Sequence, residues 1–452
     1  MVMASILDAL SNSKRALILV SIIAVLTIVD SEFINIFYGT NLGTPSNLHM
    51  LLFVSLAIVA SAINIILLLF VRGNEKAATS RSLLFRVTYI GTSTVQYSLS
   101  FILFAVIVEM LIFHEYNKVF SILVVYLSHL AAAGLLALLA FKFIQWFQFT
   151  KTISFLVYAV IFIVIIFLVL VTIPLLTEQF TNQPQLIYPR DYIVLIANVL
   201  VPSSNTAFFF GLANYVLPIM ISASWILTVS LLRSYQITIG KKVFWAIVTI
   251  PLLYQVFSYI IRDANLVSDP ALIQIVYSQQ FQILFAISYQ VSGLFFAIAF
   301  LTISRKIKRK SMKNYLIMSS IGIISLFSSM QPGLPFYATY PPFGLVTLLF
   351  FGLSSYLLLV GMLGSASSSA RDSELRREIY KGLEGQSDVF SKMGIAEMQR
   401  ELQKKVLFIT DKTKLWEEMG GSTEPNEEEV KVMIEEVLNE LHSKKSDVKS
   451  GK

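Results

Sequence analysis

Four ionisable residues lie within or beside long apolar stretches of this chain, where a charge is costly to keep. They are Asp30, Glu32, Glu109 and His129. Ionisable side chains in such stretches are scarce and commonly mark a ligand or ion pathway. Carboxylates together with an imidazole would attract a metal ion or an organic, ammonium-type cation. We therefore take these four residues as the candidate ligand-binding site.

Glu109 and His129 lie in neighbouring apolar segments that are joined by a short connection. A hairpin of two helices would bring them within reach of each other. Their spacing matches no metal-ligand motif, so no metal site is expected. The alternative interpretation is that most of these charges are solvated in loops and that one buried pair is hydrogen-bonded.

The chain carries no recognisable catalytic motif. It contains no Cys, which excludes disulfides, thiol catalysis, Cys-ligated zinc and iron–sulfur clusters. It also has no HExxH motif, no nucleophile elbow and no pair of histidines at ligand spacing. We expect neither enzymatic activity nor a bound cofactor.

The composition requires lipid around much of the chain. Of its 452 residues, 56% are hydrophobic and 14% are charged, whereas soluble domains carry about 25% charged residues. Runs long enough to span a bilayer, roughly 20 apolar residues each, occur ten times. They lie at about 16–37, 48–71, 89–113, 119–141, 153–176, 207–231, 243–261, 280–303, 315–331 and 343–364. The predicted fold class is all-α, a polytopic membrane helix bundle over residues 1–364.

The number of basic residues alternates between high and low from one gap between these segments to the next. Seventeen of the 20 basic residues before position 365 lie in one set of gaps and three in the other. Basic loops are held on the cytoplasmic side of a membrane, so the pattern predicts ten transmembrane helices with both termini inside. Contact between the basic inner loops and anionic lipid follows, and nucleic acid is not an expected partner.

The acidic residues show the opposite bias. Eight of the ten acids before position 365 are predicted on or near the outer side: Asp30, Glu32, Glu109, Glu115, Glu178, Asp191, Asp263 and Asp269. The orientation rule concerns basic residues and does not require this surplus. It suggests an outer face that attracts cations.

Residues 365–452 form a separate region in which charges dominate. We predict a small cytoplasmic tail of helices, two of which carry apolar stripes at helical spacing. These stripes would pack on each other or on the basic inner loops. The alternative is that they dock to a cytoplasmic protein or to a second copy of the chain.

Uncharged polar side chains recur in three of the predicted spans. The third contains Thr92, Ser93 and Gln96 among others, the eighth is rich in Gln, and the ninth is rich in Ser. Such residues usually join helices by hydrogen bonds, each worth well under about 2 kcal/mol. A water-lined path through the three helices is the alternative.

Three short motifs carry a resemblance to a known group of proteins. They are Pro342-Phe343-Gly344-Leu345, Gly352-Leu353-Ser354-Ser355-Tyr356 and Ala370-Arg371-Asp372-Ser373-Glu374-Leu375-Arg376-Arg377. The region around 342–442 resembles uncharacterised multi-pass membrane proteins of ammonia-oxidising archaea. The resemblance implies an archaeal cell membrane as the setting and supplies no active residue.

Three functions agree with these features. A sensor, transducer or partner-binding module would use the acidic outer face and the tail. A secondary transporter of a small cationic or polar solute would use the ten spans and the polar residues inside them. A non-catalytic subunit of a larger membrane complex would use the tail for assembly.

Overall fold

A computed structural model describes residues 13–37, 47–78, 83–113, 116–182, 204–233, 236, 240–262, 288–307, 309–330, 342–371, 389–390, 392–400 and 403. Within these ranges the structure is helical and contains no strand. The long helices are α2 (Ser13–Phe37), α3 (Asn47–Ala78), α4 (Leu83–Phe113), α5 (Lys118–Thr150), α6 (Ile153–Asn182), α8 (Ser204–Arg233), α10 (Lys241–Arg262), α13 (Ser288–Lys306), α14 (Lys310–Ser329) and α15 (Leu345–Arg371). The first compact unit of the chain, Met1–Ala396, holds all of them.

Each apolar segment predicted from the sequence coincides over most of its length with one of these helices, which confirms the all-α fold class. Five are long and apolar enough to cross a membrane within the described residues: Leu48–Gly73, Leu84–Phe113, Lys118–Thr150, Ile153–Thr177 and Leu345–Ala370. The chain is thus compatible with a membrane protein. Ten spans and the placement of both termini inside stay predictions.

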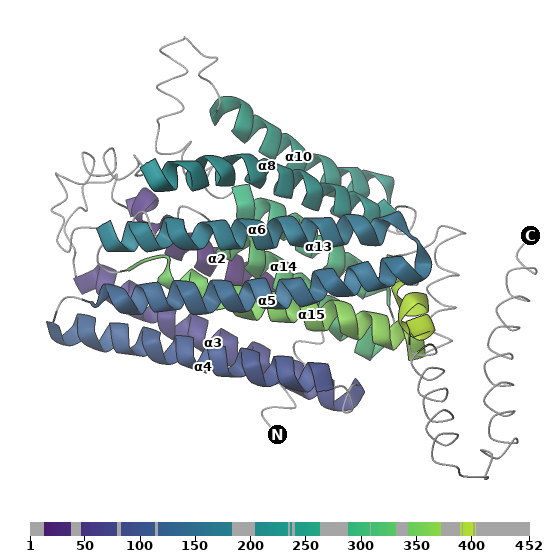
Figure 1. Cartoon of the computed structure of the whole chain (residues 1–452), viewed down its shortest axis with the longest axis horizontal. Coiled ribbons are helices and arrows are strands. Elements are labelled where there is room, and N and C mark those ends of the chain that lie inside the picture. The colour runs from purple at the N-terminus through teal and green to yellow at the C-terminus, as the bar shows by residue number, and fades with distance from the viewer. Residues whose placement is uncertain are drawn as a thin grey trace, which may run out of the picture. The chain divides into compact units, whose positions relative to one another are not determined.

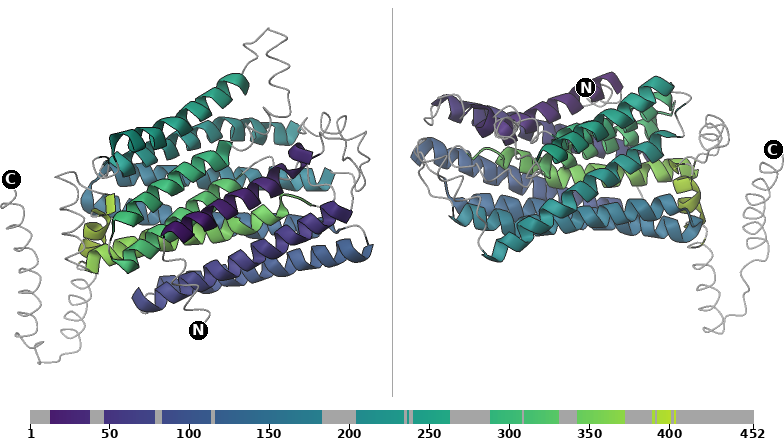
Figure 2. Two further views of the ribbon diagram at one scale, coloured as in Figure 1. Left: turned by 180° about the vertical axis from the view of Figure 1, so that it is seen from behind. Right: turned by 90° about the horizontal axis from the view of Figure 1, so that it is seen from above.

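Most helices of the first unit, among them α3, α4, α5, α6 and α8, have similar axis directions, and α10 is inclined to them (Figure 1). The pair α3 and α4 lies at one edge and the pair α8 and α10 at the opposite edge, and the view from behind keeps this order (Figure 2). Trp225 in α8 joins the second pair, because its indole N–H donates to the Val248 carbonyl of α10 at 2.7 Å.

The hairpin of α4 and α5 shows how local sequence sets the helix ends. Asn117 precedes α5, and its side-chain oxygen accepts a hydrogen bond from the Val119 amide at 3.0 Å, which satisfies one of the amides left open at a helix start. At the other end Lys151 adopts a left-handed conformation with φ 53°. Its amide donates to the Phe147 carbonyl at 2.7 Å and closes the last turn.

Burial differs strongly between the centre and the edge of the first unit. The most apolar stretch of α15 is completely buried, whereas only 28% of the corresponding stretch of α4 is buried. Large apolar side chains such as Phe101 and Phe104 of α4 are exposed instead. Exposed apolar surface on this scale needs a partner, and lipid is the natural one for a helix of this length.

Small residues let the two central helices approach closely. A Cβ atom at Gly322 of α14 would stand 2.8 Å from the Leu358 amide nitrogen and 2.8 Å from the Ser354 carbonyl oxygen of α15. At Gly361 of α15 a Cβ would meet Ser319 of α14. Backbone-to-backbone packing of this kind is typical of helices that associate inside membranes.

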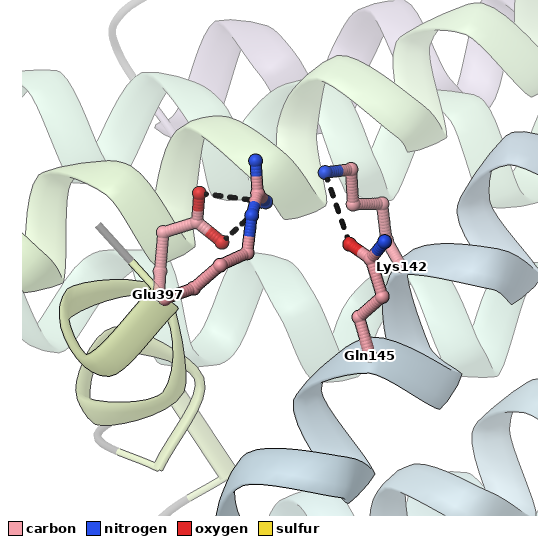
Figure 3. Close-up of polar contacts among 4 residues, drawn as sticks. Lys142, Gln145 and Glu397 are labelled. Carbon is pink, nitrogen blue, oxygen red and sulfur yellow. Dashed lines mark hydrogen bonds and ion pairs between the residues drawn. The ribbon is translucent and has the colours of Figure 1, made fainter. Parts of the chain in front are cut away.

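The first compact unit ends at Ala396, beyond the boundary predicted at residues 364–365. The predicted boundary marks a change of composition and stays a prediction. Helix α15 continues to Arg371, and Phe390 packs edge-on against Phe300 of α13 with ring centroids 6.2 Å apart. The second unit is Glu397–Lys452. In it Arg400 pairs with Glu397 at 3.0 Å (Figure 3). Most of the predicted tail lies outside the described residues.

We predict that Gly322→Ala destabilises the purified protein by about 1–3 kcal/mol, because the added methyl group would overlap with backbone atoms that have no room to move. Gly91→Ala is the matched control, since a Cβ at Gly91 of α4 meets no atom within 4 Å. Thermal unfolding in detergent measures both variants. Equal unfolding temperatures for the two would contradict the close contact between α14 and α15.

Candidate functional site

Asp30 lies near the end of the described side chains of α2 and binds the start of α15. Its Oδ2 atom accepts a hydrogen bond from the Thr347 amide at 2.7 Å and a second one from the Thr347 hydroxyl at 2.7 Å. The residue is fully buried. The first amides of a helix have no partner within the helix, so a carboxyl group 317 residues earlier in the chain supplies one.

The motif that precedes α15 presents these amides to Asp30. Gly344 has a φ of 93°, a conformation that glycine adopts at little cost, and its amide lies next to the Asp30 carboxyl group. Phe343 packs edge-on against Phe53 of α3, with ring centroids 5.7 Å apart. The Pro342–Leu345 motif therefore forms the helix start that Asp30 caps.

Helix α14 also takes part in this cluster. The Ser329 hydroxyl donates to the Thr347 carbonyl at 3.0 Å, so Thr347 joins α2, α14 and α15. Asp30, Ser329 and Thr347 are each at most 1% exposed. The second carboxyl oxygen of Asp30, Oδ1, accepts no hydrogen bond from the described residues.

Glu109 has a local structural role. Its Oε2 atom accepts a hydrogen bond from the Asn117 amide at 2.8 Å, and Asn117 in turn caps α5. The side chain is partly exposed. Glu109 therefore helps to fix the turn between α4 and α5.

His129 lies in the interface between α5 and α15. Its Nδ1 atom is 2.9 Å from the Val125 carbonyl and 3.1 Å from the Ser128 hydroxyl. Because a carbonyl only accepts, Nδ1 carries the proton in this arrangement. The ring packs edge-on against Phe351, four residues after Thr347, with centroids 4.8 Å apart.

That Asp30, Glu32, Glu109 and His129 form one ligand-binding site stays a prediction. No hydrogen bond or ion pair joins any two of Asp30, Glu109 and His129 in the described residues. The Glu32 side chain lies outside the described part of the chain, as do the side chains of the other outer acids. Across the described ranges no group of three or more His, Asp or Glu residues is placed to hold a metal ion. The cation-attracting outer face stays a prediction.

A second polar feature lies inside the bundle, on α4. Thr92, Ser93 and Gln96 are each buried, and their side-chain oxygen and nitrogen atoms make no hydrogen bond to the described residues. A buried polar group without a partner costs about 1–3 kcal/mol. The sequence marked these residues as part of a polar stripe, but their burial depends on α15, which packs against α4.

Comparison of the chain with known protein families, with curated proteins and with solved structures finds no match. The resemblance to archaeal membrane proteins therefore stays a prediction.

We predict that Asp30→Ala lowers the free energy of unfolding by about 1–3 kcal/mol, because the Thr347 amide and hydroxyl lose their buried acceptor. Thr347→Val removes only the hydroxyl bond and should cost less. Thr172→Val is the control, since that buried hydroxyl bonds only to the Leu168 carbonyl of its own helix at 2.7 Å. Chemical unfolding in detergent measures all three. A cost for Asp30→Ala no greater than for Thr172→Val would contradict the cap.

Proposed function

We propose that the chain is a sensor or transducer of the cell membrane with ten spans and both termini in the cytoplasm. In this proposal α15 carries a signal from the outer side, where Asp30 holds its first turn, to the cytoplasmic tail. Anionic lipid binds the basic inner loops, and the tail binds a cytoplasmic protein or a second copy of the chain.

The course of α15 supports this proposal most directly. It is one helix of 27 residues, and its most apolar stretch is buried over its full length. Asp30 bonds to its first turn. In its last turns, Ser369 lies against Gly394, which follows Phe390 and Met393 in the part of the tail nearest to the bundle.

A shift of the first turn of α15 would reach its other end because a helix is stiff along its axis. The close contacts at Gly322 and Gly361 join α15 to α14, so the two helices would move as one body. Lipid-facing helices such as α4 are not packed in this way. The interfaces around α15 are therefore where two arrangements of the bundle would differ.

A specific observation favours transport as the second candidate. Besides Gln96, Asn64 of α3 is 2% exposed and neither atom of its amide has a partner in the described residues. Pro251 lies inside α10, and a proline within a helix frees a backbone carbonyl. Polar groups of this kind would line the route of a small polar solute.

We predict the orientation of the later spans from single cysteines in this Cys-free chain. Ser268→Cys should react with a membrane-impermeant thiol reagent in intact cells, and Ser234→Cys only after permeabilisation, because α10 separates them in the ten-span topology. Ser46→Cys and Ser80→Cys serve as the outer and inner controls. Reaction of positions 234 and 268 from the same side would show that α10 does not cross the membrane.

We further predict that the cap and the tail are coupled. Asp30→Asn should change the labelling rate of Gln403→Cys by at least about threefold in the full-length protein in liposomes, because the weaker cap loosens the first turn of α15. Gln403 suits this test because its side chain is exposed. Thr172→Val should leave that rate unchanged. If Asp30→Asn and Thr172→Val give the same labelling rate, the transduction proposal fails.

A further inference from the structure

The polar atoms of Thr92, Ser93 and Gln96 lie on one face of α4. Thr92 and Ser93 precede Gln96 by four and three residues, and this spacing places side chains on the same side of a helix. The three residues are 4%, 9% and 1% exposed, respectively. Four atoms therefore face the interior without a hydrogen bond from the described residues: Thr92 Oγ1, Ser93 Oγ, Gln96 Oε1 and Gln96 Nε2.

Two other threonines in these helices bond to their own helix backbone. Thr88, one turn before Thr92, donates to the Leu84 carbonyl at 2.9 Å. Thr228 of α8 donates in the same way to the Ser224 carbonyl at 2.9 Å. Bonding to the carbonyl four residues earlier is the usual solution for Ser and Thr in a membrane helix. The hydroxyls of Thr92 and Ser93 make no such bond to the described residues, as is also true of Ser319, Ser325 and Ser328 of α14. On α4, however, the two hydroxyls share one helix face with the unpaired Gln96 amide.

Gly352 of α15 lies directly beside the Gln96 amide. A Cβ atom at this glycine would stand 3.5 Å from Gln96 Nε2, 3.8 Å from the Ser128 carbonyl oxygen of α5 and 3.4 Å from the Ala131 Cβ. The amide thus lies where α4, α5 and α15 meet. The Gln96 Nε2 donor and the Ser128 carbonyl acceptor both lie next to Gly352. A methyl group added to Gly352 would be in ordinary van der Waals contact with its neighbours, without a clash.

The chemistry around Gln96 is neutral. Its amide and the two hydroxyls both donate and accept hydrogen bonds. On α5, His129 follows Ser128, whose carbonyl lies near Gly352. The Nδ1 atom of His129 is already bonded to the Val125 carbonyl. An ion would find no opposite charge among the three residues.

We infer that Thr92, Ser93 and Gln96, closed by Gly352, form a binding site for a small uncharged molecule that both donates and accepts hydrogen bonds. Water and urea-sized amides share this chemistry. In the interior of a membrane protein unsatisfied polar groups are costly, so an occupant accounts for four orphan atoms on one helix face. The inference rests on these contacts and not on the role of the tail.

Cysteine labelling tests this site in the full-length protein reconstituted in liposomes. A thiol reacts as the thiolate, which forms where water or polar groups solvate it. Ser93→Cys, nearly isosteric, should react with a small methanethiosulfonate reagent at least about tenfold faster than Ala60→Cys. Ala60 is the matched control, because it is fully buried in α3 among apolar side chains. Thr92→Cys repeats the test if Ser93→Cys does not fold.

Two further measurements test the site. The first fills it with a methyl group, and the second distinguishes bound water from a bound amide. Gly352→Ala adds a methyl group that the neighbouring atoms can accommodate, and it should slow the labelling of Ser93→Cys at least about threefold at an unchanged unfolding temperature. Urea added at increasing concentration below unfolding should slow the labelling if an amide binds, and should leave it unchanged if water alone fills the site. Fast labelling of Ser93→Cys supports the site whether urea slows it or leaves it unchanged. Equal rates for Ser93→Cys and Ala60→Cys would overturn it.

Discussion

A membrane offers no water to the open amides at the start of a helix, so each such start needs a partner from the protein. Helix α15 begins inside the bundle, and Asp30 is that partner, with two bonds of 2.7 Å to Thr347. The contact joins the first long helix of the chain to the last one of the bundle. Ser329 brings α14 into the same cluster. Asp30 therefore links α2 to α15, and through Thr347 to α14, by one buried carboxyl group.

The rest of the bundle follows from what surrounds each helix. At the centre, α14 and α15 have small residues where their backbones touch, and Ser320 of α14 donates a hydrogen bond to the Ala297 carbonyl of α13 at 2.8 Å. At the edge, α4 exposes aromatic side chains such as Phe101 and Phe104, whereas Thr92, Ser93 and Gln96 are buried. The unpaired polar atoms around Gln96 lie on the buried face of α4, next to Gly352 of α15, and this is where we propose a polar occupant.

The sequence was sufficient to predict the helices, because the apolar runs and the charge alternation are local patterns that a membrane imposes. It did not identify Thr347, since helical spacing contains no information about a partner 317 residues away. The predicted hairpin of Glu109 and His129 exists as α4 and α5, yet each residue bonds within its own turn or helix. Gln96 was visible as a polar residue, but only the packing of α15 shows that it is buried.

Hydrogen exchange of the full-length protein in lipid nanodiscs tests the central claim, that Asp30 holds the start of α15. In Asp30→Ala, amides of residues 345–351 should exchange at least about tenfold faster than in the unmodified protein, while amides in the part of α4 around the exposed Phe101 and Phe104 keep their rates. Unchanged exchange over residues 345–351 would contradict the account, because α15 would then hold its first turn without the carboxyl group.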